Sequence, residues 1–124
     1  MHRVSAGVIL LALMVSSLGA QTPKKQTTIF GEVIDVVSYV SSGMKPDNAD
    51  RKAVAEANIR AGNPLGILER KTGTIYIVAM AQAGTSAAET LRPYFGYRVF
   101  AQGRIFRKGG LQLFLLSDIG KSVK

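Results

Sequence analysis

The sequence predicts a mainly β domain, in which five short strands curl into a small barrel and one α-helix is inserted after the first strand. Side chains alternate between apolar and polar along several short runs, which is the two-residue period of a β-strand. Glycine-containing turns separate these runs, and only residues 48–61 combine an alanine-rich composition with helical spacing. The chain of 124 residues has room for one domain with a hydrophobic core.

The clearest local signal is a long hairpin over residues 96–119. In its first arm, Tyr97, Val99, Ala101 and Ile105 share one face, and Arg98, Phe100, Gln102, Arg104 and Phe106 share the other. Gly109 and Gly110 supply the turn, after which Leu111, Leu113 and Leu115 alternate with Gln112, Phe114 and Leu116. Gly103 interrupts the first arm, and an interior glycine predicts a bulge or a sharp bend.

Residues 1–20 are predicted to be a secretory signal peptide. His2 and Arg3 form a short basic start, residues 4–18 are apolar, and small residues follow at the expected cleavage position. The apolar run is shorter than the roughly twenty residues that a membrane-spanning helix needs, and an uncleaved anchor is the alternative. We therefore expect an exported protein, periplasmic or secreted, with no membrane span after cleavage.

The remaining chain is expected to begin with a flexible leader at residues 21–28 and to end with a short tail at 121–124, on either side of a barrel domain at 29–120. The first strand is predicted at residues 29–40, because the stretch is rich in β-branched and aromatic side chains. A helix is predicted over 48–61, and we expect Asp47 to be its N-cap.

A second hairpin is predicted from residues 65–70 and 74–81. Its outgoing arm is apolar on both faces, so one face needs a cover besides the core. The helix at 48–61 is the nearest candidate, and a partner chain is the alternative. A short helical link is predicted at residues 89–94, before the long hairpin.

This order of five strands, with a helical connection between the third and the fourth, matches an OB-fold, a partly open Greek-key barrel. An open antiparallel sheet with the helix on one face is the alternative. The segments GEVIDVVSYVSSG, AGNPLGIL with TGTIYIV, and LRPYFGYRVFAQGRIFRKGGLQLFLLSDI resemble a family of small exported bacterial proteins of OB-like fold and mostly unassigned function.

The resemblance covers nearly the whole chain after the signal peptide, and its motifs concern the fold. Some relatives carry a cysteine where this chain has Ser38, a histidine where it has Arg51, and cysteines where it has Val54 and Asn58. Such a set could bind a metal or haem, or act in redox chemistry. All four positions are replaced here, so the resemblance implies the fold and the export without a metal or thiol site.

The residue inventory also argues against an enzyme. The chain has no cysteine, and its only histidine is His2, within the predicted signal peptide. Glu32 and Asp35 lie three apart in a predicted strand and so point to opposite faces, which does not suit paired acid and base catalysis. Asp47 and Asp50 are better explained by helix capping than by calcium binding. We expect no catalytic residue, no metal and no cofactor.

Charge suggests the kind of partner. The net charge of +8 becomes +7 without Arg3, which favours anionic partners. We expect the partner to be an anionic ligand or an envelope protein. The alternative is a basic surface that only keeps an exported protein in solution. Export and the lack of a dense basic stripe argue against nucleic acid.

A candidate ligand-binding face alternates guanidinium and aromatic groups, as OB domains do when they stack a ring and hold an anion. Its residues are Arg98, Phe100, Arg104 and Phe106, with Tyr76 expected nearby. In the alternative interpretation, the phenylalanines belong to the core and the arginines are edge charges that discourage pairing between molecules. The function predicted first is a non-catalytic binding or accessory domain, and the alternative is a structural envelope protein acting through homodimer or assembly contacts.

Overall fold

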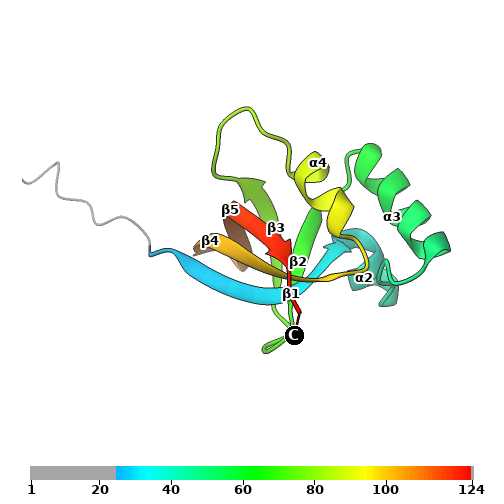
Figure 1. Cartoon of the computed structure of the whole chain (residues 1–124), viewed down its shortest axis with the longest axis horizontal. Helices are drawn as coiled ribbons and strands as arrows, with labels where there is room; N and C mark the ends of the chain where they lie inside the picture. Colours follow the sequence, from blue (N-terminus) through cyan, green and yellow to red (C-terminus); the bar gives the residue numbers. More distant parts are fainter. Residues whose placement is uncertain (1–24, 124) are drawn as a thin grey trace, which may run out of the picture.

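In the computed structural model, which describes residues 25–123, five strands form one closed sheet (Figure 1). Sheet order is β1-β2-β3-β5-β4, and β4 pairs back onto β1. All neighbouring pairs are antiparallel except β3 and β5, which run parallel. The strands are β1 (Thr27–Asp35), β2 (Leu65–Glu69), β3 (Ile75–Met80), β4 (Arg98–Lys108) and β5 (Leu111–Lys121). The predicted mainly β class with five strands is confirmed, whereas the predicted signal peptide lies outside the described residues.

Helices occupy the connections on either side of β2 and β3. Two of them, α2 (Val36–Ser42) and α3 (Ala49–Arg60), lie between β1 and β2. The third, α4 (Ala87–Leu91), continues into a short 3-10 turn, η1 (Arg92–Tyr94), before β4. The alanine-rich helix α3 was expected to cover β3, but its main contact is with β1.

Residues 36–40 are the clearest departure from the sequence prediction, because they are helical and not part of the first strand. The β-branched composition favours a strand, but long-range contacts override it. The backbone N–H of Val36 donates to the Pro64 carbonyl at 3.2 Å, and the Ser38 hydroxyl donates to Asp35 at 2.6 Å. Gly43, at φ 72°, ends α2 in the left-handed conformation that glycine adopts readily.

The N-cap of α3 is Asn48, one residue after the predicted Asp47. The Asn48 side chain accepts a hydrogen bond from the backbone N–H of Arg51 at 2.9 Å, which satisfies a free donor of the first turn. Asp47 instead forms an ion pair with the Arg51 side chain at 3.0 Å. The cap is misplaced by one residue because asparagine and aspartate cap equally well, and sequence alone does not choose between neighbours.

The ends of the domain also differ from the prediction. The expected leader reaches into β1, because Thr27 and Thr28 pair with β4 opposite Gly103 and Gln102. The expected tail reaches into β5, where Lys121 pairs with Val99. Both additions lengthen the contact of β4 with its two neighbours.

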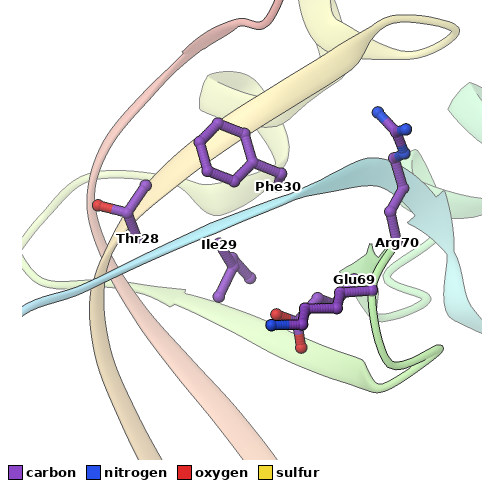
Figure 2. Close-up of a pocket in the computed structure, with 6 residues that line it drawn as sticks. Thr28, Ile29, Phe30, Glu69 and Arg70 are labelled. Atoms are coloured by element: carbon purple, nitrogen blue, oxygen red, sulfur yellow. The ribbon is translucent and has the colours of Figure 1, made fainter. Parts of the chain in front are cut away.

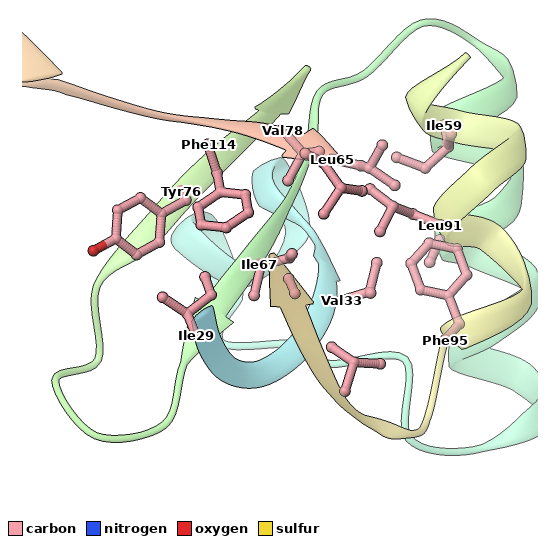
Figure 3. Close-up of a cluster of buried hydrophobic side chains, with 14 residues drawn as sticks. Ile29, Val33, Ile59, Leu65, Ile67, Tyr76, Val78, Leu91, Phe95 and Phe114 are labelled. Atoms are coloured by element: carbon pink, nitrogen blue, oxygen red, sulfur yellow. The ribbon is translucent and has the colours of Figure 1, made fainter. Parts of the chain in front are cut away.

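The core fills the inside of the closed sheet and extends to the helices at one end (Figure 3). Phe114 is fully buried and packs edge-on against Tyr76, with ring centroids 5.9 Å apart. At the helical end, Ile59, Leu91 and Phe95 join the same cluster. Burying such side chains contributes about 1.5–3 kcal/mol each, which is the main support of a fold without disulfides.

The predicted irregularity at Gly103 is confirmed as a shift of register between β4 and β5. Gln102 lies opposite Asp118, but Gly103 lies opposite Leu116, so β5 carries one extra residue, Ser117. In β5 the fully buried side chains are Phe114 and Leu116, while the alternate set, Leu111, Leu113 and Leu115, remains partly or largely exposed.

Candidate functional site

The outer face of β1 and β4 carries two aromatic rings opposite one another. Phe30 pairs with Phe100 across the two strands, and Phe100 pairs on its other side with Gly120. A Cβ at Gly120 would lie 2.7 Å from the Phe100 ring, so this glycine leaves room for the ring beside β5. Phe30 is 51% exposed, and Phe100 is half-buried. The result is an aromatic surface that faces outward from the sheet.

Arg98 lies at the next outward position of β4, one step along from Phe100. Its neighbour across the strands is Glu32, but the Glu32 carboxylate is paired with the ammonium of Lys45 at 2.9 Å. That interaction also raises the pKa of Lys45 above its ordinary value, the hydrogen bond to Glu32 being the largest cause. Among residues 25–123, Arg98 makes no ion pair, and it is exposed. Its guanidinium is therefore available to an anion beside the aromatic surface.

An open hollow of about 510 Å³ lies along the other edge of this surface (Figure 2). It forms because β1 pairs with β2 only from Gly31 onward, so the earlier part of β1 diverges from the β2–β3 hairpin. In Figure 2, the Phe30 ring and the Arg70 guanidinium lie on the same side of β1, whereas Ile29 and Glu69 lie on the other. The residues that line the hollow are Thr28, Ile29, Phe30, Glu69, Arg70 and Lys71.

We define the aromatic-basic surface as Phe30, Phe100, Arg98 and Arg70. Two of its four members, Phe30 and Arg70, were not among the residues predicted from the sequence. Their position depends on pairing between β1 and β4 and between β1 and the β2–β3 turn, where the backbone N–H of Arg70 donates to the Phe30 carbonyl at 3.0 Å. The only sequence signal was the apolar Phe30 next to Gly31 in a stretch that otherwise alternates irregularly.

Arg104 and Phe106 point to the same side of β4 as Arg98 and Phe100, but they lie farther along the strand. At about 3.3 Å per residue, Arg98 and Phe106 are separated by roughly 26 Å along the backbone. This part of β4 has passed the end of β1, and Arg104 and Phe106 lie opposite Leu115 and Leu113 of β5. The predicted face is therefore two separate surfaces, one with Arg98 and Phe100 and the other with Arg104 and Phe106.

Tyr76 lies apart from the other predicted site residues. It is 3% exposed, points into the core, and packs against Phe114. Its hydroxyl accepts a hydrogen bond from the Arg107 guanidinium at 3.3 Å. Because both faces of β3 are apolar, the sequence could not indicate which one faces inward.

A buried polar cluster ties α2 and α3 to the end of β1. Asp35 is 1% exposed, and its Oδ2 accepts hydrogen bonds from the Ser38 hydroxyl and the Asn58 amide, both at 2.6 Å. The Asn58 amide also donates to the Ser38 hydroxyl at 3.2 Å. Within the described part of the chain, Asp35 Oδ1 has no hydrogen-bond partner. These contacts join the start of α2 and the C-terminal half of α3 to the end of β1.

Residues 25–123 contain no group of three or more histidine, cysteine, aspartate or glutamate side chains that could hold a metal ion. Over the same residues, no helix is long and apolar enough to cross a membrane. Comparisons with protein-family models, with curated proteins and with solved structures gave no significant match. The geometry of this chain is therefore the basis for inferring its function.

Proposed function

We propose that this protein is a non-catalytic, exported binding domain with an OB-like barrel, and that it holds an anionic ligand or partner on the aromatic-basic surface. The sheet order β1-β2-β3-β5-β4, with β3 and β5 parallel, supports the OB-like assignment, because a five-stranded Greek-key barrel closes in this way. The basic N-terminal start and apolar run of residues 2–18 support export.

The observation that carries the proposal is the pairing of Phe30 with Phe100 beside Arg98, which forms no ion pair within residues 25–123. Single exposed apolar side chains are common and need no explanation. Two adjacent rings on an outer sheet face, flanked by a guanidinium whose carboxylate neighbour is already paired, form a more specific arrangement. A ring of the ligand can stack on the phenylalanines at about 1–3 kcal/mol, while its acidic group contacts Arg98.

The experiment uses naphthalene-1-sulfonate as the probe, because it combines one aromatic ring system with one fixed negative charge. Binding is followed by NMR chemical shifts of the backbone amides of β1 and β4. The variants are Phe30→Ser and Arg98→Glu, and the control is Arg104→Glu, which makes the same charge change on the same side of β4 outside the surface. We expect the first two to weaken binding at least tenfold and the control to leave it within about twofold.

Two results would contradict this function. One is binding that is unchanged in Phe30→Ser, which would remove the rings from recognition. The other is an equal loss in Arg98→Glu and Arg104→Glu, which would mean that the probe senses only the net positive charge.

A second candidate function is assembly with copies of the same chain. A row of outward apolar side chains crosses three strands, since Ile77 pairs with Leu113 and Leu113 pairs with Phe106. Leu111 extends this row and is 55% exposed. Sedimentation equilibrium at increasing protein concentration tests it: assembly predicts a rising average mass that Leu111→Glu reduces, and a monomer at every concentration excludes it.

A further inference from the structure

Two lysine side chains converge on the ring of Tyr97 at the helical end of the sheet. The Lys121 ammonium lies 3.9 Å from the ring centre, and the Lys52 ammonium lies 5.5 Å from it. Lys52 belongs to α3, Lys121 is the last residue of β5, and Tyr97 immediately precedes β4. The fold therefore gathers two positive charges and one aromatic ring from three segments that are far apart in the sequence.

No carboxylate in the described part of the chain neutralises these two lysines. A small hollow beside Tyr97 is lined by two acidic residues, Glu32 and Asp47. Both acids are already paired, Glu32 with Lys45 at 2.9 Å and Asp47 with Arg51 at 3.0 Å. The ammonium groups of Lys52 and Lys121 thus remain as excess positive charge around one ring.

Lys52 also lies at a position in α3 where a positive charge is unfavourable. It is the fourth residue of α3, close to the positive end of the helix dipole, where acidic side chains are favoured and cations are not. Among residues 25–123, Lys52 forms no ion pair with an acidic side chain of its own helix. An anion at this position would be attracted both by the side chains and by the first turn of α3.

Gly96 provides the space through which Lys52 reaches Tyr97. A Cβ at Gly96 would lie 2.5 Å from Cε of Lys52, and the φ of Gly96 is 87°, a conformation that other residues rarely adopt. The backbone conformation therefore favours glycine at this position, and the missing side chain leaves room for Lys52.

The lysine pair is separate from the aromatic-basic surface. Lys121 pairs with Val99, whose side chain points inward, whereas Phe100 pairs with Gly120 on the outer face. Tyr97 and Lys121 thus have the inward parity and lie at the end of the strands. A ligand here would cover the end of the sheet next to α3, and not its outer wall.

We propose that Lys52, Tyr97 and Lys121 form a second binding site, which takes a doubly charged oxyanion such as a phosphate or sulfate group. Two ammonium groups match the charge of such a group better than that of a single carboxylate. Tyr97 is 44% exposed, so part of its ring can contact the group that carries the oxyanion. This site does not depend on the function proposed above for the aromatic-basic surface.

The test is a titration of the ¹⁵N-labelled protein at constant ionic strength with inorganic phosphate, sulfate and acetate in separate series. The backbone amides of Gly96, Tyr97 and Lys121 report on the site. We expect saturable shifts with phosphate and sulfate, and at least fivefold weaker binding of acetate, which carries one charge. The variants Lys52→Gln and Lys121→Gln should each weaken phosphate binding at least about fivefold, and the double variant should abolish saturation.

Lys108→Gln is the matched control, because Lys108 is an exposed lysine at the opposite end of β4. It should leave the phosphate titration unchanged. Equal losses in Lys108→Gln and Lys121→Gln, or saturation that survives in the double lysine variant, would overturn the proposal. Acetate binding as tight as that of phosphate would overturn the preference for a doubly charged group. Naphthalene-1-sulfonate binding through Phe30 and Phe100 is measured separately, so failure of either proposal is distinguished from failure of the other.

Discussion

Replacing Asn58 with alanine tests whether the buried cluster around Asp35 holds α3 in place. The substitution removes a 2.6 Å hydrogen bond to a carboxylate that is 1% exposed. Only the Ser38 hydroxyl would then remain as a donor, since Oδ1 has no partner among residues 25–123. A hydrogen bond to a charged group contributes about 1.5–3 kcal/mol, so we expect the free energy of unfolding to fall by about 2 kcal/mol.

The assay is urea denaturation followed by circular dichroism, with the change read from the midpoint at constant slope. Val54→Ala is the control, because Val54 lies on the same helix and is 46% exposed. It should change the free energy of unfolding by less than about 0.5 kcal/mol. Amide hydrogen exchange in α3 should also accelerate in Asn58→Ala and not in Val54→Ala, because the cluster joins this helix to β1.

A double-mutant cycle with Asp35→Asn tests whether the cost of Asn58→Ala depends on the Asp35 carboxylate. The asparagine side chain is neutral and of equal size, so it removes the negative charge to which the Asn58 amide donates. In that background, Asn58→Ala should lower the free energy of unfolding by about 1 kcal/mol or less. A change in stability of less than about 0.5 kcal/mol for Asn58→Ala in the otherwise unaltered protein would show that the cluster does not hold α3. An equal cost with aspartate and with asparagine at position 35 would contradict the expected dependence on the carboxylate.

Two further predictions concern the core and the ion pair near the lysine site. Phe114→Ala should lower the free energy of unfolding by about 3–5 kcal/mol, because this ring is fully buried, whereas Leu111→Ala, at 55% exposure, should cost less than about 1 kcal/mol in the same denaturation assay. The Glu32 carboxylate raises the pKa of Lys45 above 10.5, so its stabilisation is present below pH 10.5 and is lost as the pH rises through the folded-state pKa. Since the Lys45 side chain is 39% exposed, Lys45→Met should cost less than about 1 kcal/mol at pH 7, and thermal melts should show that difference shrinking above pH 10.5. A difference that grows at high pH would contradict this sign.

The strands could be predicted because the alternation of apolar and polar side chains depends only on neighbouring residues. In β4, the predicted apolar positions Val99 and Ala101 are both fully buried, and Arg98 points outward. Gly103 predicted the irregularity that the register shift confirms. These features need only neighbouring residues and the pleat of a strand.

The sequence failed where distant contacts decide local structure. Val36 and Val37 favour a strand by composition, yet the Pro64 carbonyl and the Asp35 cluster support a helix there. The face of β3 could not be assigned because both faces are apolar. Tyr76 was expected near Arg98 and Phe100, but it points into the core. Such errors arise because hydrophobic periodicity indicates the type of element but not which other element packs against each of its faces.

Both proposed binding sites arise from the closure of the sheet, and this explains why neither is visible as a motif. Phe30 meets Phe100 only because β4 returns to β1, and Lys121 meets Tyr97 only because β5 follows β4 to its first residues. An unclosed arrangement of the same strands would leave each ring and each cation as an isolated side chain. The basic charge of the chain is dispersed in sequence, but strand pairing and the position of α3 concentrate part of it around exposed aromatic rings. The anion binding that we propose would therefore be a property of the topology, and variants that loosen the β1–β4 pairing should weaken it without changing a cationic side chain.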